Sequence, residues 1–430
     1  MQAGDNLVKL IANQSGLTSD LSLIILSPHL QQGLSVQLAS RYFQDGSSSR
    51  VSAGVEPYQA ALDRCVAKVK AVLPQFGLRN PKIGNADLGW TFCSPCDWVV
   101  GFFSGQLWLA ATLTGDPVFR EAAQARRPAF RYILEHRHAR DHDLGFQFSL
   151  HAVADWRVTG STVAREMALH AAQALLARFD EAGQYLQAWN TGPDDPEMAR
   201  FTRGRMIADT MQNLALLHWA HRETGIGEFR EVAELHAQTT RRHIVRADGS
   251  SYHTFRFDPV TGEPLGGQTV QGAADESCWS RGQAWLVHGF AQCHAATGTP
   301  AHLDAARLLA ATAEALMGDE RVPVWDWRLA PDQGPRHLDS SAGAIMAAGL
   351  YLLADQTEGD EAARWRAFAD RLLDGLLAQC DLSGDARAMG LLAHGAAHVR
   401  EGRFDTMLPY GDYYFMEALM RSLGHTQFFW

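Results

Sequence analysis

The chain has 430 residues, of which 46% are apolar and 20% charged, and its 38 basic and 48 acidic side chains give a formal charge of -10. So much apolar surface in so long a chain can bury a large core, which excludes a disordered or low-complexity protein. The acidic balance argues against a duplex-binding protein, because such proteins normally present a basic face to the phosphates. We expect a globular protein without a nucleic-acid partner.

The first 50 residues are predicted to form a separate leader of unknown role. Residues 45–49 read Asp-Gly-Ser-Ser-Ser, a flexible break before helical periodicity begins. The most apolar run in the leader, Leu21–Leu26, is far shorter than the roughly 18 residues of a membrane span and lacks a basic region and a cleavage site. We therefore expect a soluble, cytoplasmic protein with no membrane partner, whose residues 51–430 form one domain.

A pattern of an apolar helix, a Thr-Gly turn and an amphipathic helix recurs along that domain. The turns are Thr114-Gly115, Thr159-Gly160, Thr224-Gly225 and Thr297-Gly298, with a looser copy at Thr357-Glu358-Gly359. Glycine after a helix is the expected left-handed cap, and a short turn makes the next helix antiparallel, so each copy predicts an αα-hairpin. The spacing of 45 to 73 residues between turn glycines is too long for most solenoid repeats.

A sixth hairpin is expected to end near residues 410–421. Six hairpins can close on themselves and hide the apolar helices inside, so we predict an all-α fold, a six-hairpin α/α barrel (α/α toroid). The Gly-, Asp- and Ser-rich segment 247–277 interrupts the helices. Within it residues 252–258 alternate and residues 259–262 form a turn, which predicts a small inserted β-hairpin.

Acidic, aromatic and imidazole side chains concentrate in segments 96–108, 141–146, 204–209 and 271–285. Aromatic faces beside carboxylates suit a sugar site, since rings stack on C–H faces and polar groups bind hydroxyls. Asp209 follows Met-Ile-Ala in an apolar helical stretch, where burial would raise its pKa as a general acid requires.

Several of these residues also fit a structural role. Asp143 fits either a site carboxylate or the N-cap of the helix that begins with Leu-Gly-Phe. The tryptophans fit either a pocket wall or core packing; they are Trp98, Trp189, Trp279 and Trp285. We predict no metal ion at the His- and Asp-rich segment 136–143, because the His136-Arg-His138 spacing is not the i, i+4 pairing that a helix needs and two arginines are interleaved. Cys93 and Cys96 form a lone C-x-x-C pair and are expected to be ordinary thiols.

A series of short motifs runs through the chain in one order. They are Asp97-Trp98 with the following Gly-Phe-Phe-Ser-Gly-Gln-Leu-Trp, His142-Asp143-Leu-Gly-Phe, Gln187-Ala-Trp189, Gly204-Arg-Met-Ile-Ala-Asp209, Ser251-Tyr-His253, Gln271-Gly, Trp279-Ser-Arg281-Gly-Gln-Ala-Trp285, Asp339-Ser-Ser-Ala and Tyr410-Gly-Asp-Tyr-Tyr. In these motifs, over roughly residues 55–422, the sequence resembles the unsaturated glucuronyl hydrolases of glycoside hydrolase family 88, which are six-hairpin α/α barrels.

The resemblance implies an enzyme, without a cofactor, that removes a 4,5-unsaturated uronic acid from the non-reducing end of glycosaminoglycan fragments made by lyases. Protonation of C4 develops oxocarbenium character at C5, water adds there, and the resulting hemiketal opens. It implies that Asp209 is the general acid and base. Asp143 would bind ring hydroxyls and raise the pKa of Asp209 by its like charge.

By the same resemblance, His142, His253, Gln271 and Arg281 contact the substrate, and Trp98, Trp189, Trp279 and Trp285 are walls of the pocket. We infer that Arg281 offsets the uronate charge. The chain departs from the family at residues 395–400, where some members recognise sulfate. Ala396 and Ala397 offer no hydroxyl there, although Arg400 and Arg403 could still contact a sulfate.

Three alternatives remain at this point: an unsaturated rhamnogalacturonyl hydrolase acting on pectin fragments, a sugar epimerase that uses His253 as a base, and a non-catalytic glycan-binding barrel. In each case the partner is an oligosaccharide. We expect a monomer or a weak homo-oligomer.

Overall fold

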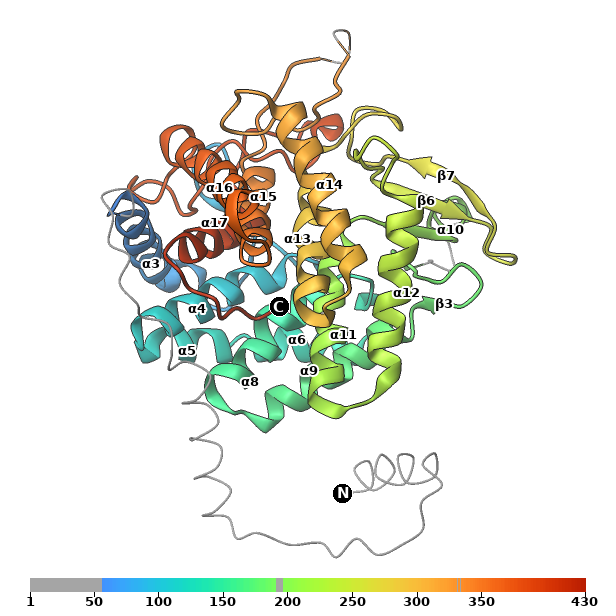
Figure 1. Ribbon diagram of the computed structural model, residues 1–430. Coiled ribbons are helices and arrows are strands. Elements are labelled where there is room, and N and C mark those ends of the chain that lie inside the picture. The colour runs from blue at the N-terminus through green and yellow to red at the C-terminus, as the bar shows by residue number, and fades with distance from the viewer. Residues whose placement is uncertain (1–55, 191–195, 331, 333) are drawn as a thin grey trace, which may run out of the picture.

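The computed structural model describes residues 56–190, 196–330, 332 and 334–430, so the predicted leader lies outside the described residues. Its helices form an inner and an outer layer (Figure 1). The inner segments are α4 (Val100–Thr114), α7 (Leu144–Phe148) continued by the π-helical turn η2 (Ser149–Val153) and α8 (Ala154–Thr159), α11 (Thr210–Thr224), α13 (Ser280–Thr297), α15 (Ser340–Ala354) and α17 (Pro409–Ser422). The outer segments are α3 (Glu56–Phe76), α5 (Pro117–Gln124) with α6 (Arg127–Glu135), α9 (Thr162–Leu176), α12 (Gly227–His243), α14 (Pro300–Met317) and α16 (Gly359–Gln379).

The inner segments close into a ring. Each packs against the next along the chain, and α17 packs back against α4. The outer helix α3 packs against α17, so the sixth pair joins segments from opposite ends of the described chain. The layers differ as predicted: α4 is buried over its entire first twelve residues, whereas α12 buries only one face. The six-hairpin α/α barrel is confirmed.

The Thr-Gly turns have the expected geometry. Gly115, Gly160, Gly225 and Gly298 follow inner helices with φ between 68° and 73°, a left-handed conformation that glycine adopts without a steric penalty. The looser copy differs, since α15 ends at Ala354 and Gly359 is instead the first residue of α16.

Close helix approach in the ring also depends on glycine. Within the described residues, a glycine whose Cβ would clash or fit only tightly lies at every contact between neighbouring inner segments; these are Gly101, Gly145, Gly289, Gly349, Gly411 and Gly105. At the α7–α11 contact, for example, a Cβ on Gly145 would lie 2.3 Å from the Cα of Asn213. At Gly101, Gly145 and Gly349 the inner segments therefore approach backbone to backbone, whereas Gly105 makes room for the ring of Tyr413.

The strands form three small antiparallel sheets. The first pairs β1 (Pro81–Gly84) with β2 (Trp90–Phe92), and the second pairs β3 (Phe179–Asp180) with β4 (Tyr185–Leu186). In the third, β6 (Thr254–Phe257) and β7 (Pro264–Gln268) confirm the predicted hairpin, and β5 (Arg205–Ile207) adds an edge strand that the sequence did not predict. The short elements are η1 (Arg137–Ala139), α10 (Pro196–Thr202) and η3 (Val399–Glu401).

The register of β5 against β6 matters for the site. Ile207 pairs with Thr254, and the N–H of Ala208 donates to the carbonyl of His253 at 2.9 Å. This pairing places Asp209 next to His253.

In the described part of the chain, no helix is both long and apolar enough to cross a membrane.

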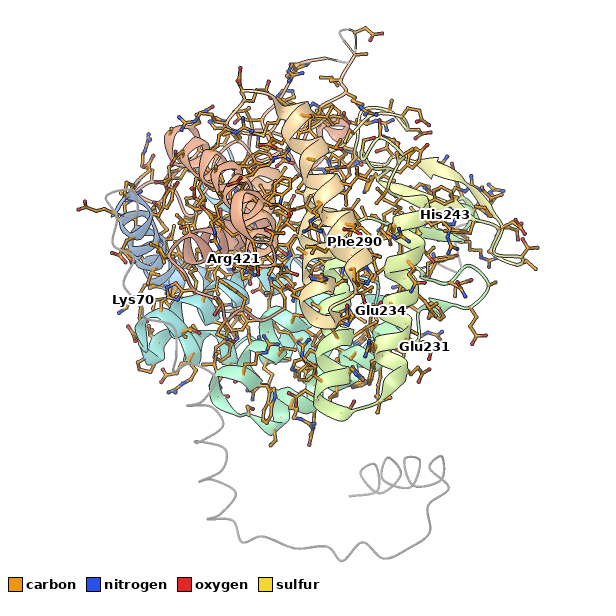
Figure 2. All side chains as sticks on the ribbon, viewed as in Figure 1. Lys70, Glu231, Glu234, His243, Phe290 and Arg421 are labelled. Atoms are coloured by element: carbon orange, nitrogen blue, oxygen red, sulfur yellow. The ribbon has the colours of Figure 1, made fainter. Side chains whose placement is uncertain are left out.

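A buried ionic network on α17 supports the ring. Glu417 accepts hydrogen bonds from Arg421, His288 and the indole of Trp430, at 2.9, 3.2 and 2.7 Å (Arg421 is labelled in Figure 2). Burial alone would raise the pKa of Glu417, but Arg421 and His288 outweigh it and lower that pKa to about 2. The network therefore stabilises the fold above the unfolded-state pKa of about 4.5 and loses this contribution as the pH falls toward 2.

We expect Glu417→Gln to lower the free energy of unfolding at pH 7 by about 3 kcal/mol, because the Arg421 charge stays buried without its partner. The difference from the unmodified chain should shrink as the pH falls from about 4.5 toward 2. Urea denaturation at several pH values measures both effects. Glu314→Gln, which breaks a half-exposed pair with Arg364, is the control and should cost less than about 1 kcal/mol. Equal losses in the two variants would contradict the prediction.

Candidate active site

The two predicted carboxylates lie where two neighbouring inner helices begin. Asp143 directly precedes α7, and Asp209 directly precedes α11. Among the described residues neither carboxylate hydrogen-bonds the first turn of its helix, so the N-cap alternative for Asp143 is not observed. Asp209 was expected inside a helical stretch; it instead follows β5 and starts the helix, but it is only 8% exposed.

Burial controls the acidity of Asp209. It raises the pKa of this carboxyl to about 7, against the opposing charge of Arg281. Its Oδ2 atom is buried and has no hydrogen-bond partner among the described residues. A carboxyl group in this state is divided between its protonated and ionised forms near neutral pH, as an acid that must also act as a base requires.

The pKa of Asp143 is also raised. Burial raises its pKa well above the usual range, and repulsion from Asp141 and Asp209 adds to the effect, whereas the hydrogen bond from Asn213 acts in the opposite direction. We predicted that the like charge would act on Asp209. Burial is the largest cause of the raised pKa of Asp209, and the effect of the Asp143 charge on that pKa stays a prediction.

The ring nitrogens of His253 have different roles. Nδ1 accepts hydrogen bonds from the N–H groups of Val270 and Gln271, at 3.0 and 3.2 Å, so the ring proton of the neutral histidine is on Nε2. That nitrogen lies 4.0 Å from Oδ2 of Asp209. Burial lowers the pKa of His253 well below its usual value. His253 thus presents an N–H donor to Asp209, which does not suit the base that an epimerase would need.

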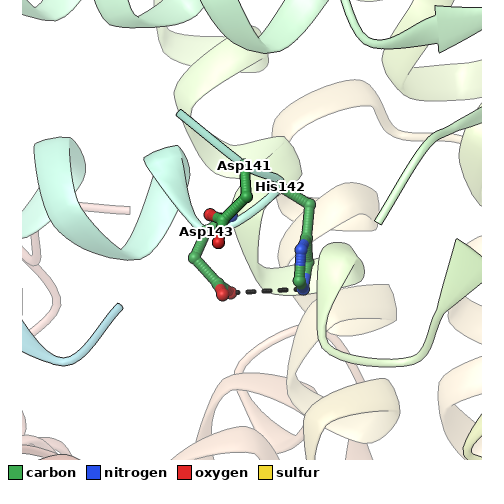
Figure 3. A group of neighbouring side chains, drawn as sticks. All are labelled: Asp141, His142 and Asp143. Atoms are coloured by element: carbon green, nitrogen blue, oxygen red, sulfur yellow. Dashed lines mark hydrogen bonds and ion pairs between the residues drawn. The ribbon is translucent and has the colours of Figure 1, made fainter. Parts of the chain in front are cut away.

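His142 has the opposite arrangement. Its Nδ1 lies 2.9 Å from the carbonyl oxygen of Ala188 and so carries the proton, which leaves a lone pair on Nε2. This lone pair faces Oδ1 of Asp143 at 3.4 Å (Figure 3). Burial lowers the pKa of His142 to about 3, so the ring is neutral. A lone pair facing a carboxyl group favours the protonated form of Asp143.

Among the described residues, one cluster of side chains could supply three ligands to a metal ion. It consists of Asp141, His142 and Asp143, whose potential ligand atoms lie within 4.8 Å of one another (Figure 3). An Asp141 carboxylate oxygen accepts the backbone N–H of Asp143 at 2.9 Å, and Nε2 of His142 is directed at Asp143. Because these potential ligand atoms already have partners within the segment, the absence of a metal ion stays our prediction.

A cavity of about 140 Å³ opens beside Asp209. Its lining comprises Lys82, Ile83, Asp97, Trp98, Val99, Asp209, Gln271, Arg281, Ala397, His398, Arg403, Leu408 and Tyr410. Trp98, Gln271 and Arg281 were predicted to line it. Lys82 was missed, and it pairs with Asp97 at 2.7 Å. The sequence feature that could have placed this ion pair at the pocket is the position of Asp97 next to Trp98.

Arg281 is fully engaged within the protein. It donates to a carboxylate oxygen of Asp339, to the carbonyls of Ala396 and Ala397, and to Oε1 of Gln271, all at 2.5 to 2.9 Å. Asp339 balances its charge, and the other bonds hold Gln271 and the segment 396–397 on the pocket wall. This geometry favours a role for Arg281 in shaping the pocket over direct neutralisation of a uronate.

The predicted tryptophans occupy different positions. Trp98 lies on the pocket wall, 4.9 Å from the ring of Tyr410, and Trp279 lies under the Arg281 guanidinium. Trp189 lines a different cavity, of about 260 Å³. The expectation that Trp285 is a wall is corrected, because it is fully buried behind Phe146.

Fold and site together define an α/α-barrel glycoside hydrolase. No protein-family model matches the chain. It is 39% identical over 370 residues to an unsaturated glucuronyl hydrolase of Bacillus sp. (strain GL1), covering 85% of this chain and 96% of that protein. It is 31% identical to an unsaturated chondroitin disaccharide hydrolase of Streptococcus pyogenes serotype M1, over 87% of this chain and 93% of that one. The chain belongs to the unsaturated glucuronyl hydrolase family.

Solved structures agree. The Bacillus sp. GL1 enzyme, described as responsible for the degradation of glycosaminoglycan, superimposes with a TM-score of 0.80 at 38% identity, over 85% of this chain and 96% of that one. A variant of the Streptococcus agalactiae enzyme complexed with dGlcA-GalNAc6S gives a TM-score of 0.75 at 26% identity, over 91% and 97% of the two chains.

Proposed function

We propose that this enzyme removes 4,5-unsaturated uronic acid from the non-reducing end of lyase-generated, glycosaminoglycan-derived oligosaccharides. The observation that carries the proposal is the buried carboxyl of Asp209, which has a pKa of about 7, borders the pocket and has an Oδ2 atom without a partner among the described residues. The relatives named for glucuronyl and chondroitin disaccharide substrates support the substrate class.

The reaction follows from the enol ether in the substrate. Asp209 gives its proton to C4, and positive charge develops at C5 and the ring oxygen. The resulting carboxylate then takes a proton from a water molecule, whose oxygen bonds to C5. The hemiketal opens to a ketone at C5, and the rearranged product releases the remaining saccharide as its glycosidic bond breaks. The usual pair of carboxylates that flank the scissile bond is not required.

The neighbouring side chains stabilise the ionised form of Asp209 and bind the sugar. The Nε2–H of His253 faces Asp209 and favours its ionised form after proton transfer. Asp143, next to the lone pair of His142, would bind ring hydroxyls as an uncharged group. Trp98 and Tyr410 offer aromatic faces to the sugar, and Gln271 offers its amide.

We expect the enzyme to remove the ultraviolet absorbance of the ene group in unsaturated chondroitin, hyaluronan or heparin disaccharides. In deuterium oxide the product should carry one solvent deuterium at C4, because hydration protonates that carbon. Mass spectrometry and NMR measure the label. An unsaturated rhamnogalacturonyl disaccharide serves as the comparison substrate. Cleavage without deuterium at C4 would indicate ordinary hydrolysis, and faster turnover of the pectin fragment would favour the rhamnogalacturonyl alternative.

We further propose that the enzyme is cytoplasmic and is a monomer or a weak homo-oligomer. All six cysteines are free thiols, which is typical of a reducing compartment. Burial raises the pKa of Cys93 to about 12, so this thiol is unreactive although it lies in a C-x-x-C pair. Analytical ultracentrifugation over a range of protein concentrations would determine the oligomeric state.

A further inference from the structure

Asn213 connects the two aspartates. It lies one turn after Asp209 on α11 and is fully buried. Its Nδ2 donates to Oδ1 of Asp143 at 3.5 Å and to the backbone carbonyl of Asp209 at 3.3 Å. A single amide group therefore bridges the starts of two inner helices, and each of those helices carries one of the carboxyl groups.

The orientation of this amide is determined by a second contact. Its Oδ1 accepts the backbone N–H of Phe146, in the first turn of α7, at 2.7 Å. An amide with its oxygen held in this way must present its N–H groups to Asp143. The backbones of α7 and α11 also approach closely here, since a Cβ on Gly145 would lie 2.5 Å from the carbonyl oxygen of Asn213.

We propose that Asn213 is a positioning residue that holds Asp143 and Asp209 as one unit and sets the pH range of the reaction, an inference that rests on the proposed function. The charged and titratable groups that face the two carboxyls are Asp141, His142, Arg178, His253, Arg281 and Tyr410. Asn213, which does not titrate, adds an N–H that stabilises the ionised form of Asp143. Without it, the carboxyl cluster would retain its protons to higher pH.

Two variants test this proposal through the pH dependence of kcat/KM. Asn213→Asp keeps an oxygen for the Phe146 N–H but places a third carboxyl beside Asp143, so the fall of kcat/KM at alkaline pH should move up by on the order of one pH unit. Asn213→Ser removes the amide without adding an acid and should move the profile in the same direction by less. In both variants kcat should fall by about tenfold or more, because the carboxyls lose their alignment.

Gln212→Glu is the matched control. Gln212 is the adjacent residue on α11 and is equally buried, but its amide bonds to the carbonyl of Trp285 and to the hydroxyl of Tyr414. Its profile should stay within a few tenths of a pH unit of the unmodified enzyme. Asn213 variants that lose activity equally at every pH, with the alkaline fall of kcat/KM unmoved, would show a merely structural role and overturn the proposal.

Failure of the proposed function would look different. In that case the unmodified enzyme would not act on any unsaturated disaccharide. The coupling would then be measured by NMR titration of the aspartate carboxyl carbons, in which Asn213→Ser should raise the pKa of Asp143. An unchanged Asp143 titration in the folded variant would overturn the inference independently of activity.

Discussion

Asp209→Asn is expected to abolish hydrolysis, with kcat reduced by about 1000-fold or more, because one carboxyl both donates the proton to C4 and accepts a proton from water. In the unmodified enzyme, kcat/KM should fall as the pH rises above about 7, where this acid loses its proton. Assays by loss of ene absorbance at several pH values measure both effects. Asp304→Asn, at an exposed carboxylate on α14, is the control and should leave activity unchanged.

The same variant should be more stable than the unmodified enzyme at alkaline pH. The pKa of Asp209 rises from 3.8 to about 7 on folding, so the folded state binds this proton more tightly and loses stability as the pH rises between those values. Asparagine removes that loss. We expect a gain of at most about 4 kcal/mol at pH 8, which disappears below pH 4. An active Asp209→Asn enzyme, or one less stable at pH 8, would contradict the assignment.

The second large effect is expected at Gly145→Ala. A Cβ at this position would lie 2.3 Å from the Cα and 2.5 Å from the carbonyl oxygen of Asn213, and neither backbone atom can move without displacing α11. We expect a loss of about 3 kcal/mol or more in the free energy of unfolding, measured by urea denaturation. Activity should also fall, because the displacement separates the two aspartates.

Gly227→Ala is the matched control for this substitution. Gly227 begins α12, where a Cβ would meet no atom within 4 Å, so alanine should change stability by less than about 1 kcal/mol. If Gly145→Ala lost no more free energy of unfolding than this control, the α7–α11 contact would be looser than the structure indicates. The argument that Asn213 positions the two aspartates would then be weaker.

Local signals determined the architecture from sequence. The Thr-Gly turns end inner helices because glycine alone adopts a left-handed conformation at no steric cost, and this preference acts over a few residues. The contrast between apolar and amphipathic helices likewise depends on residues close together in the chain. Asp209 was recognisable for the same reason, since an acidic residue among apolar neighbours predicts a buried carboxyl group.

Only the tertiary structure decided the rest of the site. Asn213 is an ordinary core amide in the sequence, and its partner Asp143 is 70 residues away. The Nε2 proton of His253 follows from backbone N–H groups of residues 270 and 271, which the β6–β7 hairpin brings beside it. Arg281 and Trp285 were identified by motif, but their contacts were not. Burial, hydrogen-bond direction and pKa depend on groups that meet through folding, and a pattern of neighbouring residues does not contain them.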